Sequence, residues 1–231
     1  MELYSHDLQW VLRCLPHRVL ELMKSEGPKV VVAGGFVRSS VAGERANDID
    51  IFCRSPEQAE SYAQRLAGQY KVLETGNAYS VKKVGGHFVQ FIHRWTYADP
   101  PSLLDSFDFT IACAAIWWDE QWKSLAHDRF YADLAAKRLI YLKPVRNEDA
   151  GGSVLRVLKF YQRGFRIPLD SLGAVIARLV GAVDFETIEA GGGETREKQV
   201  AKVLTGLLRE VDPNIDPTHI AHLPSLAEEE D

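Results

Sequence analysis

The sequence is poor in cysteine, with three among its 231 residues: Cys14, Cys53 and Cys113. They are too few and too widely spaced for a disulfide framework, and no Cys-x-x-Cys pair is present to suggest a zinc site. The seven histidines show neither an HExxH motif nor another paired spacing typical of metal ligands. These absences exclude disulfide-rich secreted proteins and the common zinc enzymes, and they favour a reduced, cytoplasmic setting.

Long apolar runs and an excess of positive charge are also missing. The longest mostly apolar stretch, Phe109–Trp118, is about half as long as a membrane-spanning helix requires. The opening MELYSHDLQW lacks the basic and apolar regions of a signal peptide. We therefore expect a cytoplasmic protein without membrane association. The net charge of −5 argues against a protein that coats long nucleic acid through bulk charge, but it allows a local basic cleft.

Hydrophobic periodicity divides the chain into parts of different character. Up to about residue 145, helical patterns at 7–24, 36–42 and 56–70 alternate with strand patterns at 30–33, 48–53, 71–74, 78–84, 87–95 and 107–118. From about Val154 onward the pattern is helical. We therefore predict an α+β protein. Residues 1–145 should form a small mixed β-sheet with flanking helices, residues 146–215 a helical domain, and residues 216–231 an acidic tail.

Two aspartates lie in the segment most suggestive of chemistry, residues 30–52, which reads VVVAGGFVRSSVAGERANDIDIF. Alternate side chains of a strand share a face, so Asp48 and Asp50 should point the same way. Two neighbouring carboxylates repel each other unless a cation lies between them, and Mg²⁺ is the natural partner of such oxygens. Taken alone, an Asp-x-Asp pair is more often a solvated strand face.

The same segment contains features suited to a phosphate. Gly34 and Gly35 follow a predicted strand and precede a predicted short helix. Glycines allow backbone N–H groups to approach a phosphate closely, and a helix start adds its positive end. Arg38 supplies a fixed positive charge nearby. Together with the two aspartates, these residues are the parts needed to hold a metal-bound triphosphate, although a lone Gly-Gly is usually only a turn.

This combination resembles the signature of the polymerase-beta-type nucleotidyltransferase superfamily. The likeness is closest to the head and neck of CCA-adding enzymes and bacterial poly(A) polymerases, which have Gly-Gly-x-Val-Arg-Asp followed by Asp-x-Asp. Residues 34–38 match this motif, whereas Ser39 stands in place of its aspartate. Residues 107–111 (FDFTI) resemble the family's Asp-Phe-Thr-Ile strand without the Arg pair that precedes it, and residues 155–165 resemble its neck helix.

The resemblance implies a nucleotidyltransferase head over residues 1–145 and a helical neck over residues 146–215. A chain of this kind is similar to the compact nucleotidyltransferases of phages and antiviral defence. The resemblance also implies that Asp48 and Asp50 are catalytic residues that bind metal. We expect Asp108 to be the third carboxylate, on a strand face shared with Thr110, with Asp105 as the alternative and loop capping as the structural explanation of Asp108.

Further residues are implied in nucleotide binding. Gly34, Gly35 and Arg38 are expected at the phosphates, and Asn77 beside the sugar. Three basic residues of the neck helix are expected at the triphosphate or the base: Arg156, Lys159 and Arg163. The structural alternatives are a tight turn, turn chemistry at a strand edge and a solvated basic helix face.

The expected function is metal-dependent, template-independent transfer of NMP or dNMP from an NTP or dNTP to a hydroxyl, with release of pyrophosphate and with Mg²⁺ or Mn²⁺ as cofactor. The acceptor hydroxyl would belong to an oligonucleotide or a protein, and the product would be a short oligonucleotide that serves as an antiviral signal. Ser225 in the tail is a candidate acceptor. The alternatives are transfer of a single nucleotide to a protein or small molecule, and a non-catalytic nucleotide-binding module.

Overall fold

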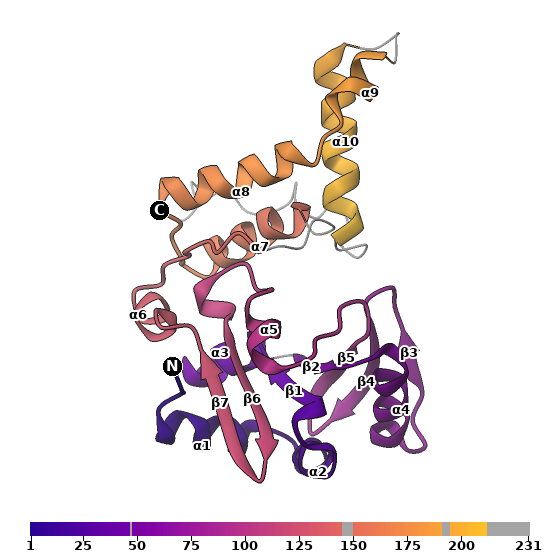
Figure 1. The fold of residues 1–231 in the computed structure, drawn as a ribbon, viewed down its shortest axis with the longest axis vertical. Coiled ribbons are helices and arrows are strands. Elements are labelled where there is room, and N and C mark those ends of the chain that lie inside the picture. The colour runs from indigo at the N-terminus through magenta and orange to yellow at the C-terminus, as the bar shows by residue number, and fades with distance from the viewer. Residues whose placement is uncertain (47, 145–149, 191–194, 212–231) are drawn as a thin grey trace, which may run out of the picture. The chain divides into compact units, whose positions relative to one another are not determined.

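The computed structural model describes residues 1–46, 48–144, 150–190 and 195–211 (Figure 1). The chain divides into two compact units, Met1–Val145 and Arg146–Asp231. Within the described ranges, no helix combines the length and the apolar character needed to cross a bilayer. The predicted tail at 216–231 and the Gly191–Gly193 segment lie outside these ranges.

The first unit is built on a seven-stranded mixed sheet with the order β3-β4-β5-β2-β1-β6-β7. The strands are β1 (Val30–Ala33), β2 (Asp48–Cys53), β3 (Val72–Glu74), β4 (Ala78–Val84), β5 (His87–Ile92), β6 (Ala114–Asp119) and β7 (Gln121–Ala126). The pair β2–β5 is parallel and the other neighbours are antiparallel. This architecture confirms the predicted α+β class with a mixed sheet.

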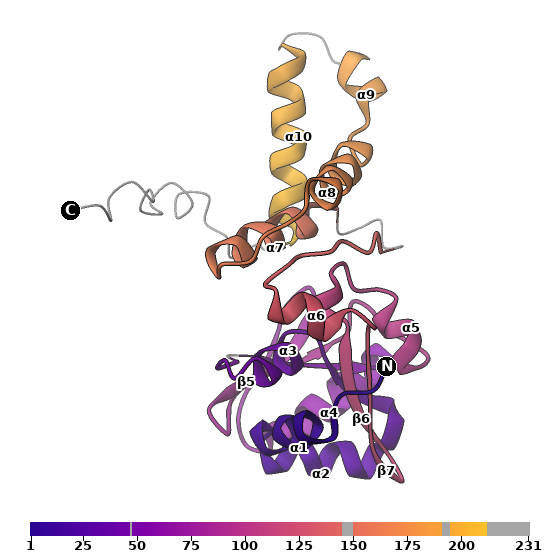
Figure 2. The same cartoon turned by 90° about the vertical axis from the view of Figure 1, so that its left-hand side faces the viewer.

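Helices α1 to α4 pack through their apolar residues on one face of this sheet (Figures 1 and 2). They are α1 (Ser5–Cys14), α2 (His17–Glu26), α3 (Gly35–Val41) and α4 (Pro56–Ala67). Pro16 separates α1 from α2, because proline is tolerated at a helix start but not inside a helix. Ser55 caps α4 by accepting a hydrogen bond from the N–H of Gln58. The larger core of the unit lies between these helices and the sheet.

The opposite face of the sheet carries a smaller apolar cluster, which includes Val31, Phe52 and Ile92. Leu103 and Leu104 of α5 (Pro100–Leu104) belong to this cluster. The remaining helical elements of the unit are η1 (Gly27–Lys29), η2 (Thr110–Ala112) and α6 (Phe130–Ala135). Asp48 and Asp50 belong to this second face, because they alternate with the buried Ile49 and Ile51.

The prediction of one strand over 107–118 is wrong in its first half. Strand β6 begins only at Ala114, and Thr110 lies in the short 3₁₀ helix η2. The Thr110 N–H donates to the carbonyl of Ile140, and its hydroxyl donates to the carboxylate of Asp133 at 2.8 Å. These contacts with a distant part of the chain draw the segment away from the sheet. Asp108 therefore lies in a loop, not on a strand face shared with Thr110.

The second unit is helical in its described part. It contains α7 (Ala150–Gln162), α8 (Leu169–Gly181), α9 (Phe185–Ala190) and α10 (Arg196–Val211). Phe160 and Phe165 pack edge to face with ring centroids 5.2 Å apart, and Val175 and Leu179 of α8 are buried. The helical periodicity after Val154 predicted this character, but α9 was not predicted.

Candidate functional site

Asp48 and Asp50 lie at the start of β2 on the same face of the sheet. Asp48 is exposed and Asp50 is half-buried, whereas Ile49 and Ile51 are fully buried on the opposite face. The strand alternation expected from the sequence is therefore present. It holds the two carboxylates next to each other at one end of the strand.

The Gly34–Gly35 turn lies at this same end of the sheet. Strands β1 and β2 are antiparallel with Val32 opposite Ile51, so the end of β1 adjoins the beginning of β2. Gly34 has φ +76°, its N–H donates to the carbonyl of Ala114 at 2.9 Å, and a Cβ there would lie 3.1 Å from the Phe107 ring. A larger residue would be strained at this positive φ, and its Cβ would require a small shift of the Phe107 ring, so glycine is the fitting residue at this turn.

Arg38 extends from α3 and is 7% exposed. Its Nη2 donates to the hydroxyl of Ser39 at 3.1 Å. Its positive charge partly opposes the rise in the pKa of Asp50 that burial and Asp48 cause. The expected contact of Arg38 with the phosphates stays a prediction.

The charge of Asp50 is nevertheless incompletely compensated. Burial and, second, the charge of Asp48 raise the pKa of Asp50 to about 7, against the opposing effect of Arg38. Loss of water around a carboxylate favours its protonated form, and a neighbouring negative charge acts in the same direction. A divalent cation between the two carboxylates would reverse both effects, so this donor set fits Mg²⁺ or Mn²⁺.

On the β5 side of the sheet, the neighbours of Asp50 are polar but uncharged. Asp50 lies opposite Gln90 of the parallel strand β5, and Gln90 lies opposite Ser80 of β4. In the part of the chain that the structure describes, no group of three or more His, Cys, Asp or Glu side chains is arranged to hold a metal ion. Two carboxylates are sufficient when substrate phosphates and water complete the coordination, as is common for Mg²⁺.

Asp108 is buried at 4% exposure in the loop before η2. Its carbonyl accepts a hydrogen bond from the N–H of Leu142 at 2.8 Å. Burial first, followed by the charges of Asp108 and Asp105, raises the pKa of the Cys113 thiol to about 12. The roles of Asp108 as third carboxylate and of Asp105 as its alternative stay predictions.

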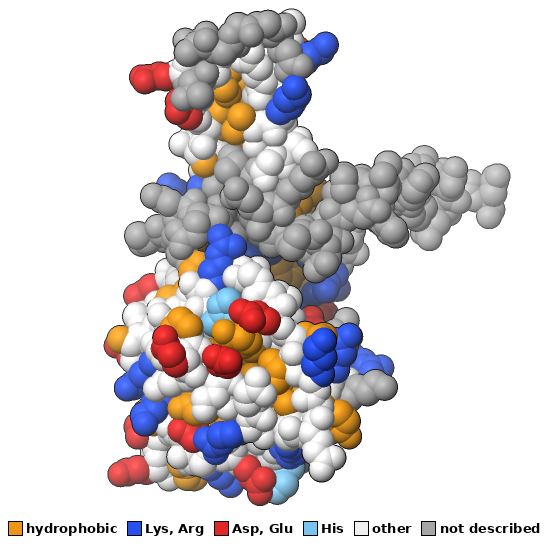
Figure 3. Space-filling view, turned by 90° about the vertical axis from the view of Figure 1, so that its right-hand side faces the viewer, with side chains coloured by type: hydrophobic (Ala, Val, Ile, Leu, Met, Phe, Trp, Pro, Cys, Tyr) orange, Lys and Arg blue, Asp and Glu red, His pale blue; other side chains and the backbone are white. Residues whose placement is uncertain are grey.

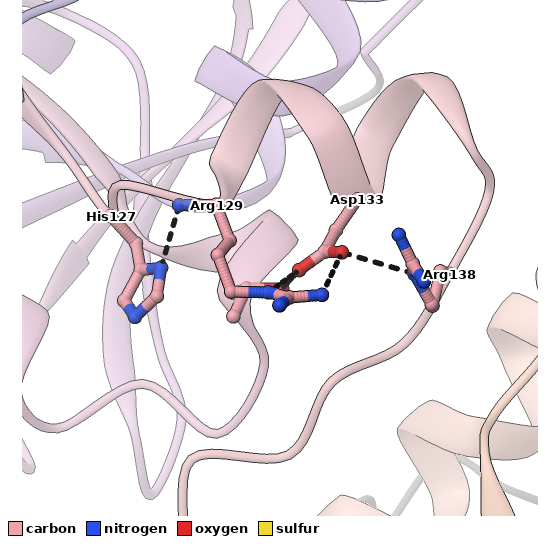
Figure 4. A network of polar contacts seen from close by, with 5 residues as sticks. His127, Arg129, Asp133 and Arg138 are labelled. Carbon is pink, nitrogen blue, oxygen red and sulfur yellow. Dashed lines mark hydrogen bonds and ion pairs between the residues drawn. The ribbon is translucent and has the colours of Figure 1, made fainter.

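The sequence reasoning missed Asp133, a fully buried carboxylate on α6 (Figure 4). Its oxygens accept hydrogen bonds from Arg129 (2.9 and 3.1 Å), Arg138 (3.1 Å) and the Thr110 hydroxyl (2.8 Å). The network ties α6 to η2 and so fixes the segment that follows Asp108. Only the i, i+4 spacing of Arg129 and Asp133 was visible in the sequence, and that spacing is common on solvated helices.

Asn77 serves the turn before β4. Its side-chain oxygen accepts a hydrogen bond from Arg94 at 3.0 Å, and its carbonyl accepts from the N–H of His93. Strand β5 pairs Phe88 with Asp48 and Ile92 with Ala78, the residue after Asn77. Asn77 is therefore displaced from Asp48 by five residues, about 16 Å along the strands. The expected contact of Asn77 with a sugar stays a prediction.

The remaining predicted residues lie outside the first unit. Arg156 and Lys159 are on α7, and Arg163 directly follows it with its guanidinium 6.0 Å from the ring centroid of Phe160. Their nucleotide-binding role stays a prediction. Ser225, the candidate acceptor, lies outside the described residues.

The sequence of this chain matches a known protein family. The model of the Gabija anti-defense 2 (Gad2) family matches residues 2–137, which is more than half of the chain. The chain belongs to the Gad2 family. This membership supports the expected link with antiviral defence. The family name describes proteins that act against a defence system, whereas the sequence had suggested a part of one. No curated protein matches this Gad2-family chain.

Solved structures show the same fold. A Thermotoga maritima CCA-adding enzyme in complex with tRNA matches with a TM-score of 0.56 and 21% identity, over 88% of this chain and 53% of that one. A CCA-adding enzyme in complex with ATP gives 0.57 and 21%, over 91% and 57%. A tRNA nucleotidyltransferase with a primer tRNA and an ATP analogue gives 0.54 and 21%, over 83% and 61%.

These likenesses confirm the resemblance to the nucleotidyltransferase fold of CCA-adding enzymes. The Gad2-family chain spans between about half and three fifths of the length of these proteins. At this level of identity the comparison establishes the fold that carries Asp48 and Asp50. The activity is a separate inference.

Proposed function

We propose that this protein is a metal-dependent, template-independent nucleotidyltransferase. It would transfer NMP or dNMP from a nucleoside triphosphate to an acceptor hydroxyl. One observation carries the proposal: Asp48 and the half-buried Asp50 share a sheet face beside the Gly34 turn, and their mutual repulsion is incompletely offset. A fold of the same kind occurs in enzymes whose solved complexes contain CTP, ATP or tRNA.

The proposed roles follow from the placement of each residue. Asp48 and Asp50 would hold a divalent cation, and that cation would neutralise phosphate charge and orient the reacting groups. The backbone at Gly34 and Gly35 receives the phosphates, and Arg38 adds positive charge on the same side. The acceptor oxygen bonds to the α-phosphorus, and the bond from that phosphorus to the oxygen bridging it to the β-phosphorus breaks. Pyrophosphate leaves with that oxygen, and the hydroxyl proton passes to solvent.

The surface of the first unit supports recognition at a local site. On the face seen in Figure 3, acidic, basic and apolar side chains are interspersed over the unit. Together with the net charge of −5, this favours an acceptor held by a few contacts over a long nucleic acid held along a basic surface.

The decisive experiment incubates the purified chain with each NTP and dNTP in Mg²⁺ or Mn²⁺. Pyrophosphate release is measured together with the mass of every product, including the protein. Pyrophosphate release that is lost in Asp50→Asn supports the proposal, and equal release by that variant refutes it. A ladder of products indicates polymerisation, whereas a single added nucleotide indicates modification of a protein or a small molecule.

A second candidate, a nucleotide-binding module without transfer, is favoured by one observation. Among the described residues, Asp48 and Asp50 lack a third acidic or histidine partner arranged for a metal ion. This module would bind NTP and Mg²⁺ with a measurable affinity by calorimetry but release no pyrophosphate with any acceptor.

The family name suggests the biological setting. We propose that nucleotide transfer by this chain acts against the Gabija defence. In bacteria that carry this defence, phage plaques should increase when the chain is expressed and should not increase with Asp50→Asn at equal protein level. Equal plaque counts with both forms would separate the anti-defence effect from nucleotide transfer.

A further inference from the structure

A row of three side chains crosses the sheet beside the aspartate pair. In the parallel pair β2–β5, Asp48 lies opposite Phe88. Lys82 of the next strand, β4, places its Nζ 5.7 Å from the centroid of the Phe88 ring. Adjacent strands are about 4.8 Å apart, so the row leads from Asp48 across Phe88 to Lys82 within about 10 Å.

The next rows on this face differ in character. The second consists of Asp50, Gln90 and Ser80, and the third of Phe52, Ile92 and Ala78. All three members of the third row are buried. The face therefore changes from an apolar, covered end to an open end, and at the open end Phe88 is 43% exposed.

An exposed phenylalanine alone is unremarkable, because single apolar residues are common on protein surfaces. Phe88 differs from such single residues because it lies between two exposed charged side chains, Asp48 on one side and Lys82 on the other. The ladder between β4 and β5 also shifts register between Val81 and Val84, beside Lys82. Such bulges redirect side chains and are frequent next to active sites.

The direction of the proposed reaction indicates that the acceptor approaches over the row formed by Asp48, Phe88 and Lys82. In an in-line displacement, the attacking oxygen and the leaving pyrophosphate lie on opposite sides of the reacting phosphorus. The phosphate side is the Gly34 turn at the end of β1, which flanks β2 on one edge. The acceptor must then approach from the other edge of β2, where β5 and β4 carry Phe88 and Lys82.

We propose that Phe88 and Lys82 bind the terminal nucleotide of an oligonucleotide acceptor. The base stacks on the Phe88 ring and a backbone phosphate pairs with Lys82, so that the terminal hydroxyl lies over Asp48. An aromatic face next to a cation matches a base and its phosphate, and stacking of this kind tolerates any base. The proposal deepens the proposed function and rests on it for the site of transfer.

Binding is tested with the full chain and a fluorescein-labelled adenosine hexamer, as RNA and as DNA, in Mg²⁺ without NTP. Fluorescence anisotropy gives the dissociation constant. Phe88→Ala should weaken binding at least about tenfold and Phe88→Trp should restore it, since each base stack contributes substantially to affinity. Lys82→Ala should reduce the dependence of log K on log salt by about 0.7, the value for one phosphate contact to a single strand.

Two matched controls lie away from the row. Tyr70 is 72% exposed and Lys71 is also exposed, so Tyr70→Ala and Lys71→Ala remove the same kinds of group from another surface. Both should bind the hexamer like the natural chain. Equal binding by Phe88→Ala and the natural chain overturns the proposal, as does an equal loss in Tyr70→Ala.

Kinetics separate this proposal from the proposed function. If transfer occurs, Phe88→Ala should raise KM for the oligonucleotide and leave the dissociation constant of NTP unchanged. The proposed binding of an oligonucleotide acceptor by Phe88 is overturned if Phe88→Ala weakens only NTP binding. It is also overturned if the chain transfers the nucleotide to a protein hydroxyl and Phe88→Ala leaves the rate of that transfer unchanged. If no form of the chain releases pyrophosphate but hexamer binding depends on Phe88, the proposed function fails while the binding surface stands.

Discussion

Asp50 and Asp133 are both withdrawn from solvent in the first unit, but their surroundings treat the negative charge in opposite ways. Asp133 accepts hydrogen bonds from two arginines and a threonine, and these contacts lower its pKa in spite of burial. Asp50 faces Asp48 and is offset by Arg38, and its pKa is raised to about 7. The compensated Asp133 stabilises the fold in its charged form, whereas the partly compensated Asp50 would need a cation to be stabilised in that form.

The largest expected effect is on catalysis at the partly compensated pair, Asp48 and Asp50. Asp50→Asn should lower the rate of nucleotide transfer by about 10³-fold or more, since removal of a metal ligand costs about 4 kcal/mol of transition-state stabilisation. Asp48→Asn should have a comparable effect. Steady-state pyrophosphate release measures both variants. Retention of more than about a tenth of the rate by either variant would contradict the assignment.

The next effect is on stability at the compensated carboxylate. Asp133→Asn should reduce the free energy of unfolding by about 3 kcal/mol, because Arg129 and Arg138 lose their shared partner. Urea denaturation at neutral pH measures the loss. Asp128→Asn provides the control, since the Asp128 side chain is 88% exposed. This substitution should change the free energy of unfolding by less than about 0.5 kcal/mol. Similar free energies of unfolding for Asp133→Asn and Asp128→Asn would contradict the stabilising role of the Asp133 contacts.

A smaller effect concerns the response of stability to pH. Because the pKa of Asp50 is raised, the folded state binds more protons than the unfolded state between about pH 4 and pH 7, so this group's contribution to stability falls as pH rises through that window. Asp50→Asn should therefore stabilise the metal-free protein at pH 8 by about 1–2 kcal/mol and have no such effect at pH 4. Thermal unfolding in EDTA at both pH values measures this difference, and equal changes would refute it.

Asp133 should respond in the opposite direction. Its lowered pKa provides stability above the ordinary carboxyl range that is lost as pH falls through the folded pKa, so Asp133→Asn should cost less in acid than at neutral pH.

The smallest expected effect is that of the cation itself. Addition of 5 mM Mg²⁺ at pH 8 should raise the free energy of unfolding of the natural chain by about 1 kcal/mol, provided that its dissociation constant is about 1 mM. The increase should diminish at pH 6, where protons compete for Asp50. Asp48→Asn should abolish it, and an undiminished increase in that variant would place the ion elsewhere.

Local patterns predicted the parts of the site that depend on neighbouring residues. The alternation around Ile49 placed both aspartates on one face, and the paired glycines marked the turn after β1. The segment after Phe107 was not predictable in this way, because its path depends on Thr110 meeting Asp133, 23 residues later. The position of Phe88 beside Asp48 likewise depends on strand register, which hydrophobic periodicity alone does not determine.

The close approach of Gly34 to the Phe107 ring links two parts of the molecule that are distant in sequence. A side chain at residue 34 would meet that ring, and Asp108 is the next residue along the chain after Phe107. Enlargement of residue 34 would therefore displace an aromatic ring whose neighbour along the chain is one of the predicted metal-binding residues.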